Sequence, residues 1–249
     1  MAAIVAAAVL TVGAGTAQAI EYDLSGGGTA TINGAFFTTT DNQSTGTGVI
    51  QSFVRISDGS PNTGLVVDGH NTSGRPLAND ENTSGKFTRD LPLSSVPIVT
   101  DPVGAAPGDY YEFLLDINQT NADPLLSLDQ IIICTAATGG LVQADGCPTG
   151  TIAYELDLGD DNWLTLDYSL NAGSGSGDLF MYVPTSVFGA GSFVYLYSVF
   201  GENENNNDGF EEWAVRAPEG TLVPEPATLL LFGAAIAGGI RRATRRRVS

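Results

Sequence analysis

The sequence predicts an all-β protein built as an antiparallel β-sandwich, with a jelly-roll-like order of strands. Two observations support this fold class. Short segments with alternating apolar and polar side chains recur along the chain, and clusters of Gly, Asn, Asp and Pro separate them. Between residues 20 and 222, no segment keeps the helical spacing of apolar side chains for more than two turns. Many short strands joined by turns of this composition are typical of sandwiches and barrels.

Residues 1–19 predict a secretory signal peptide. An apolar core covers residues 3–12, small residues follow, and Ala17 and Ala19 form an A-x-A cleavage site. A signal peptide ordinarily begins with positive charge, yet no Lys or Arg occurs before Arg55. We therefore expect the true start codon to lie upstream. The alternative is a buried N-terminal helix, which two glycines in this stretch would weaken.

Seven segments of the region 20–222 show the strand pattern clearly. In the segment 110–117 the odd positions are apolar or aromatic, whereas Glu112 and Asp116 are acidic, so we expect a strand with one face in solvent. The other clear segments are 49–56, 126–134, 152–158, 163–170, 179–183 and 193–200. Weaker ones are 29–32, 35–39, 65–68 and 213–216. The proline-rich stretch 68–109 shows little periodicity, which predicts a long connection with one short edge strand near 93–99.

The region 20–222 is long enough for one domain and is strongly acidic. All 28 acidic residues lie between Glu21 and Glu225, whereas only five of the ten basic residues precede the C-terminal tail. This excess of 23 negative charges, with Glu225 counted, repels nucleic acid and anionic lipid. Five scattered cations are too few for a phosphate track, so nucleic-acid binding is excluded.

The two cysteines, Cys134 and Cys147, are separated by 12 residues that include three glycines. In an exported chain this spacing predicts a disulfide across a loop or hairpin, which loop-closure entropy makes worth about 3 kcal/mol. The alternative is a catalytic thiol, for which His70 is the one histidine in the sequence. Because His70 lies among polar loop residues, we expect it to be solvated rather than catalytic.

Paired carboxyl groups could act in glycoside hydrolysis, but the obvious pair is unsuitable. Glu211 and Glu212 are neighbours, so in a strand they point to opposite faces and cannot flank one glycosidic bond. Asp116 could converge with Asp157 or Asp178 across strands, which the sequence leaves open. We therefore expect no enzymatic activity.

Aromatic and acidic side chains suggest two binding hypotheses. Sugars could stack on Trp163, Trp213, Tyr195 and Tyr197, although these residue types also fit the core or face of a sheet. Calcium needs six to eight oxygen ligands from flexible loops. The candidate calcium ligands are Asp157, Asp160, Asp161, Glu204 and Asp208. We expect no cofactor, with one structural calcium ion as the alternative to solvated acidic loops.

Residues 223–249 predict a single membrane-spanning helix. The apolar run 227–240 would be about 21 Å long as a helix, and counting from Val223 extends it to about 27 Å, close to the thickness of the hydrocarbon core. Five arginines follow, namely Arg241, Arg242, Arg245, Arg246 and Arg247. Because arginine clusters stay on the cytoplasmic side, the region before Pro224 should lie on the opposite side of the membrane.

This ending resembles the PEP-CTERM sorting signal of Gram-negative bacteria. The matching residues are the triplet Pro224, Glu225 and Pro226, the apolar core 229–233 and the arginine tail 241–247. The resemblance implies a transient partner, a membrane-embedded exosortase of transpeptidase type, which cuts near the triplet and passes the protein to the exterior. The name ice-binding protein C-terminal domain is also used for such tails and implies no ice binding. An uncleaved single-pass anchor is the alternative.

The region 20–222 is itself similar to a group of exported PEP-CTERM proteins with a GFEEW-type ending. The similarity rests on four short motifs, 115–119, 127–129, 173–178 and 207–213. It implies a fold and a destination but no reaction. We expect an exported cell-surface or matrix protein with a structural or adhesive role among extracellular polysaccharides. A carbohydrate-binding module and an extracellular hydrolase are the alternatives.

Overall fold

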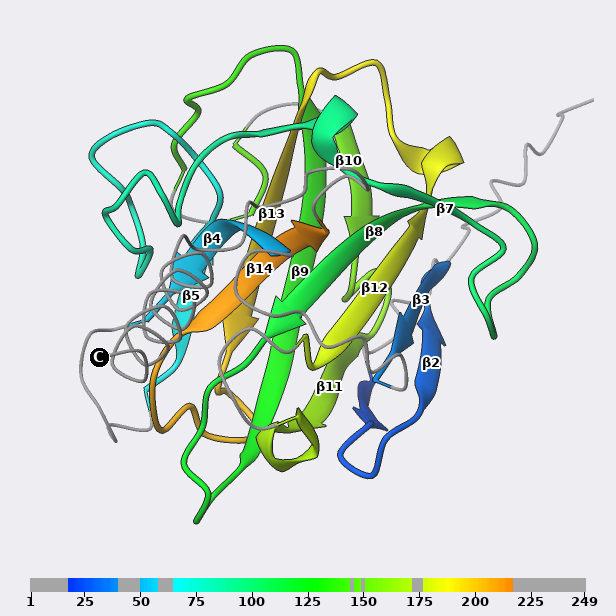
Figure 1. Cartoon of the computed structure of the whole chain (residues 1–249), viewed down its shortest axis with the longest axis vertical. Helices are drawn as coiled ribbons and strands as arrows, with labels where there is room; N and C mark the ends of the chain where they lie inside the picture. Colours follow the sequence, from blue (N-terminus) through cyan, green and yellow to red (C-terminus); the bar gives the residue numbers. More distant parts are fainter. Residues whose placement is uncertain are drawn as a thin grey trace, which may run out of the picture. The chain divides into compact units, whose positions relative to one another are not determined.

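The computed structural model describes residues 18–39, 50–57, 65–143, 146–148, 151–171 and 177–216. Within these residues the chain forms two β-sheets around one large apolar core, which confirms the predicted all-β sandwich (Figure 1). No helix in this part of the chain is both long enough and apolar enough to cross a bilayer. The predicted signal-peptide core, the C-terminal apolar run and the arginine tail lie outside the described residues.

In the described part of the chain, each sheet has seven strands. The first sheet runs in the order β1 (Ala19–Asp23), β11 (Asp161–Asp167), β9 (Leu125–Ala136), β13 (Phe193–Phe200) and β5 (Val67–His70), with β10 (Thr151–Glu155) on β9 and β6 (Leu91–Pro92) on β13. The second runs in the order β2 (Thr29–Ile32), β3 (Ala35–Thr38), β12 (Leu179–Pro184), β8 (Asp109–Asp116), β14 (Glu211–Arg216) and β4 (Ile50–Ile56), with β7 (Ile98–Thr100) on β8. Short 3₁₀ helices are η1 (Leu93–Ser95), η2 (Tyr168–Asn171) and η3 (Thr185–Val187).

Two details differ from the predicted fold, one in strand direction and one in the number of edge strands. β1 pairs in parallel with β11, with Ala19 opposite Asp161, so this strand begins at the predicted cleavage site. Cleavage after Ala19 stays a prediction. The single edge strand expected near 93–99 is replaced by β6, η1 and β7. Pro92 and Pro97 lack the N–H group that a continuous ladder through this stretch would need.

β8 is buried on both faces, so the prediction that one face lies in solvent is wrong. Its odd-numbered side chains from Phe113 onward face the core, while Leu114 belongs to a second apolar cluster with Phe36, Tyr110, Phe180 and Tyr182. Glu112 is 1% exposed because the Arg216 guanidinium donates two hydrogen bonds of 3.0 Å to its carboxylate. The Arg216 guanidinium thus takes the place of the solvent that the alternating sequence pattern predicts around the Glu112 carboxylate.

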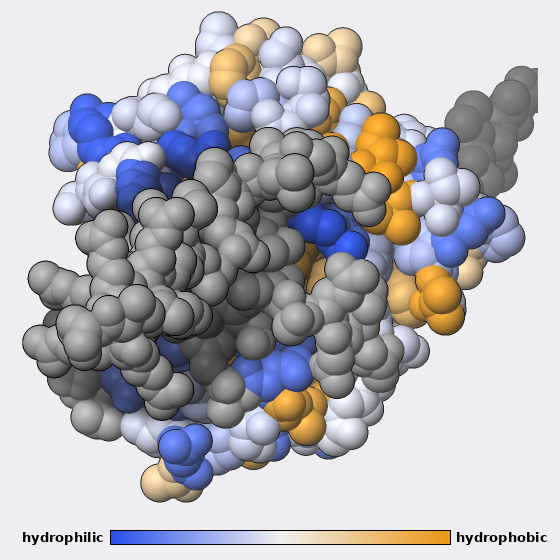
Figure 2. Space-filling view, viewed as in Figure 1, coloured by the Kyte–Doolittle hydropathy of each residue, from blue (hydrophilic) through white to orange (hydrophobic). Residues whose placement is uncertain are grey.

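The described surface is mainly polar. Figure 2 shows polar residues over most of the coloured surface on one side of the molecule, with separate apolar spots between them. Of the most exposed large apolar side chains, Ile98 and Val103 lie in and just after β7, and Leu158 lies in the β10–β11 turn. Single exposed apolar residues are ordinary on a protein surface.

Candidate functional site

Three buried carboxyl groups meet where β8 lies between β12 and β14. Asp116 ends β8, Asp178 immediately precedes β12, and Glu211 begins β14; they are 3%, 5% and 0% exposed. The strand register places the three residues at one end of adjoining strands, because Asp116 pairs with Glu212, the neighbour of Glu211, and the Asp178 backbone N–H donates to the Leu115 carbonyl at 2.8 Å. The convergence of Asp116 with Asp178, which the sequence left open, is therefore present.

N–H groups of the chain just after β8 hold two of these carboxyl groups. The Ile117 N–H donates to Asp178 Oδ2 at 2.8 Å, and the Asn118 N–H donates to Glu211 Oε2 at 3.2 Å. The Gln119 side-chain amide donates to Glu211 Oε1 at 3.1 Å. Asp178 Oδ1 is buried without a hydrogen-bond partner. Within the described residues, neither Asp178 nor Glu211 forms an ion pair.

Burial and mutual repulsion change the acidity of these groups. Burial raises the pKa of Asp178 to about 9, and the nearby carboxyl groups of Asp116 and Asp167 add to the rise against the Ile117 hydrogen bond. Burial likewise raises the pKa of Glu211 well above its usual range, with Asp178 and Asp116 contributing. Both groups therefore favour the neutral form. What this arrangement can do chemically is bind and release protons.

The arginine beside the cluster is already engaged. Arg55 of β4 forms an ion pair with Glu212, the direct partner of Asp116. Its guanidinium also lies 3.5 Å from the ring centroid of Phe87 and 3.8 Å from that of Phe210. This stacking fixes the guanidinium against the sheet, so its charge balances Glu212 first.

The loop between β13 and β14 connects the cluster to the first sheet. The Asp129 carboxylate accepts hydrogen bonds from the Ser127 hydroxyl, the Glu202 N–H and the Asn203 amide at 2.8, 2.8 and 2.9 Å. Gln119 Oε1 accepts the Asn207 N–H at 2.9 Å. Motifs 115–119, 127–129 and 207–213, together with Asp178, therefore meet at one place in the fold.

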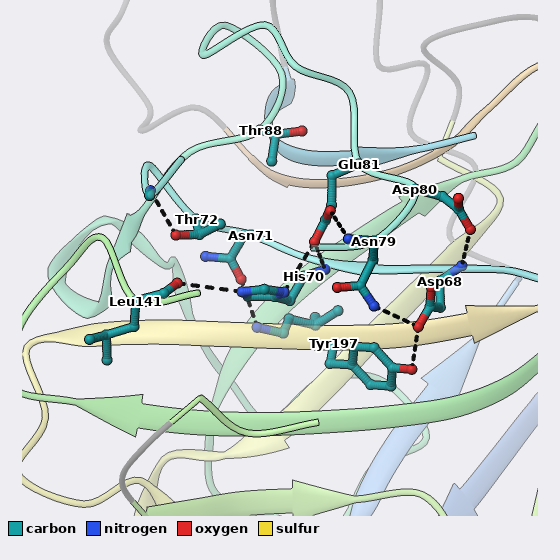
Figure 3. A network of polar contacts seen from close by, with 12 residues as sticks. Asp68, His70, Asn71, Thr72, Asn79, Asp80, Glu81, Thr88, Leu141 and Tyr197 are labelled. Carbon is teal, nitrogen blue, oxygen red and sulfur yellow. Dashed lines mark hydrogen bonds and ion pairs between the residues drawn. The ribbon is translucent and has the colours of Figure 1, made fainter. Parts of the chain in front are cut away.

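His70 is fully buried, so the expected solvated histidine is wrong. Its Nδ1 lies 3.1 Å from Glu81 Oε1, and its Nε2 lies 3.4 Å from the Leu141 carbonyl oxygen (Figure 3). Burial alone would raise the pKa of Glu81, but the hydrogen bonds from the His70 side chain and backbone lower it overall. The polar neighbours that suggested a solvent-exposed loop, Asn71 and Thr72, are buried as well.

The rest of this network attaches the segment after β5 to β13. The Asn71 amide donates to the Val194 carbonyl at 2.8 Å, and its Oδ1 accepts the Leu196 N–H at 2.6 Å. The Asp68 carboxylate accepts hydrogen bonds from Asn79 and Tyr197 at 2.7 and 2.6 Å (Figure 3). These buried hydrogen bonds attach a long loop to the first sheet.

Cys134 and Cys147 lie at disulfide distance, with their Cα atoms 5.8 Å apart. This pairing agrees with the predicted disulfide, and the described residues contain no free cysteine for a catalytic thiol. The aromatic residues considered for sugar stacking are mostly internal. Trp213, Tyr195 and Tyr197 are buried, and Trp163 is half-buried. The three buried residues therefore fit the alternative interpretation, in which these aromatic side chains pack within the sheets.

The residues proposed as calcium ligands lie in two loops. Asp157 and Asp160 lie in the β10–β11 turn and Asp161 begins β11, while Glu204 and Asp208 lie between β13 and β14. Burial raises the pKa of Asp157 to about 6, although the Asn162 N–H of β11 donates to its carboxylate and opposes the rise. Across the described ranges, no three His, Cys, Asp or Glu side chains form a group that could hold a metal ion. The calcium hypothesis thus gains no support at these residues.

Sequence reasoning missed Glu81 and Asp129 and did not join Glu211 to the Asp116–Asp178 pair. A usable signal existed for the cluster, because each of its three acids lies in one of the short motifs 115–119, 173–178 and 207–213, at or next to the end of a strand. Glu81 offered none, since it lies eleven residues from His70 in a loop without periodicity.

Comparison with known proteins gives one match. The family model of the PEP-CTERM protein-sorting motif matches residues 222–247, the segment whose resemblance the triplet and arginine tail suggested. No curated protein and no solved structure matches the chain.

Proposed function

Because the chain carries a PEP-CTERM sorting domain and is an exported protein of the kind an exosortase sorts, we propose that its acidic sandwich acts outside the cell as a structural or adhesive module among polysaccharides. The final location in this proposal is the cell surface or the extracellular matrix. No catalytic step is assigned to the module.

The observation that carries the proposal is the sorting motif that follows a strongly acidic β-sandwich in the sequence. Groups that could perform chemistry are instead used to hold the fold: His70 faces Glu81 in the interior, and Cys134 is paired with Cys147. A highly charged surface keeps such a module hydrated and soluble among extracellular polymers. A disulfide suits the oxidising exterior.

The test compares the wild-type chain with a variant in which Pro224, Glu225 and Pro226 are all replaced by alanine. A Glu219→Ala variant serves as the matched control, because it removes a charge outside the triplet. Each is produced in a host with the export machinery, and cells are separated into inner-membrane, surface and polysaccharide-matrix fractions. We expect wild type and control in the surface or matrix fraction and the triple variant in the inner membrane.

Loss of the gene should also reduce the amount of polysaccharide that stays on the cells, without changing polysaccharide chain length. Wild-type protein that washes freely from cells and matrix would contradict the structural role. Shortening of the polysaccharide by purified protein would replace it with the hydrolase alternative.

A further inference from the structure

Asp116, Asp178 and Glu211 come from three neighbouring elements and lie in the interior, and within the described residues neither Asp178 nor Glu211 has a cationic partner. Of the four carboxylate oxygens of Asp178 and Glu211, two accept backbone N–H groups and one accepts the Gln119 amide. The fourth, Asp178 Oδ1, is buried and has no hydrogen-bond partner. Burial of a carboxylate oxygen without a hydrogen-bond donor is unfavourable in free energy, so a positive ligand would stabilise this atom.

We propose that Asp116, Asp178 and Glu211 form a proton-operated clasp that fastens the beginning of β14 to β8 and β12. When protonated, a carboxyl group gains an O–H donor, and Asp178 then has a proton to share with its neighbours. When Asp178 and Glu211 ionise, negative charges accumulate at the point where β8 is joined to both neighbouring strands. The clasp closes by taking up protons and opens by losing them.

The charged groups around the clasp favour this direction. From β14 the Glu212 carboxylate faces Asp116, and from β4 Arg55 is paired with that glutamate. From β11 the Asp167 carboxylate adds negative potential at Asp178. The segment after β8 contributes neutral N–H groups and amides. The surroundings of the clasp therefore oppose its ionisation, because the charge of Arg55 is already balanced by Glu212.

A proton fits this site better than a metal ion. Among the residues that the structure describes, no three acidic, histidine or cysteine side chains are arranged to hold a metal. Proton binding does not require three side chains to surround one point, because each carboxyl group binds its own proton. In sequence, β14 is the last described strand before the sorting segment, so the clasp acts on a strand that leads toward that segment.

The sign of the pH dependence follows from linkage. The folded chain holds protons on Asp178 and Glu211 up to a higher pH than the unfolded chain, in which carboxyl groups release them near pH 4. The clasp's contribution is complete below that pH and is lost as the pH rises toward about 9. For each proton that the folded chain keeps and the unfolded chain has released, the equilibrium constant for opening rises about tenfold per pH unit.

The experiment is hydrogen exchange of the β14 amides on the full chain in mild detergent, at several values between pH 5 and pH 9, with EDTA or with calcium. The variants are Asp178→Asn, Glu211→Gln and their combination, which keep size and remove ionisation. Asp123→Asn is the control, since it removes an exposed acid that is not one of the three clasp residues. Exchange rates are corrected for the intrinsic effect of pH.

We expect protection of β14 in wild type and control to fall at least about tenfold between pH 6 and pH 9. In the double variant the fall should be less than about threefold, with protection at pH 9 above wild type. Equal pH slopes in the double variant and the control would overturn the clasp. Calcium that restores wild-type protection at pH 9 in the absence of EDTA would also overturn it, in favour of a metal site.

Discussion

Trp213 offers a direct test of how the two sheets are held together. The residue lies on β14 of the second sheet, is completely buried, and donates its indole N–H to the Ser198 hydroxyl on β13 of the first sheet at 3.0 Å. Truncation of a buried Trp to Ala costs about 3–5 kcal/mol through lost transfer energy and the cavity. The orphaned hydroxyl adds about 1 kcal/mol. We therefore expect Trp213→Ala to lower the free energy of unfolding by about 4–6 kcal/mol.

Two further variants separate packing from the hydrogen bond. Trp213→Phe keeps an aromatic ring but removes the donor, and should cost about 2 kcal/mol. Adding Ser198→Ala removes the buried hydroxyl and should restore part of that loss, which a double-mutant cycle measures directly. Urea unfolding followed by far-ultraviolet circular dichroism, with the disulfide intact, supplies the free energies. A cost below about 2 kcal/mol for Trp213→Ala would refute the packing of β14 against β13.

Three other predictions concern the disulfide and two buried acids. Replacement of Cys134 and Cys147 by serine should lower the melting temperature by roughly 6–12 °C, given about 3 kcal/mol for loop closure; calorimetry checks this, and an unchanged midpoint would mean that the bridge is not formed. Glu112→Gln leaves the Arg216 guanidinium without its carboxylate and should cost about 2 kcal/mol in urea unfolding, whereas the exposed Asp123→Asn should stay near zero. The pKa of Glu81 is lowered in the fold, so its contribution is present above about pH 4 and is lost as the pH falls. Melting curves between pH 2.5 and 5 should therefore be flatter in Glu81→Gln than in wild type, and parallel curves would disprove that linkage.

Much of the fold could be predicted because periodicity and turn composition report on strands directly. The segment 29–32 corresponds to β2, and 193–200 corresponds to β13, since apolar alternation and flanking turn residues define both. β1 was not predicted, because its residues follow the expected signal peptide and its partner β11 lies about 140 residues away in the sequence. A parallel pairing of that range leaves no local pattern.

The candidate site was harder to predict because alternation treats every acid as solvated. Glu112 and Asp116 occupy the positions that a half-exposed strand would give to water, yet both are buried. What decides their environment is a tertiary partner, Arg216 for Glu112, and a neighbouring strand for Asp116. The prediction of a solvated His70 was wrong for the same reason, since Glu81 contacts it from another part of the loop. Such pairings depend on packing, which sequence spacing does not encode.

The central claim is that this acidic sandwich is exported and sorted through its C-terminal signal. Mass spectrometry of the two termini of the protein recovered from outside the host's inner membrane tests it most directly. We predict an N-terminus at Ile20 and a C-terminus near Pro224–Pro226, without the arginine tail. Recovery of the protein only from the cytosol, or outside with Arg247 still attached, would contradict the account.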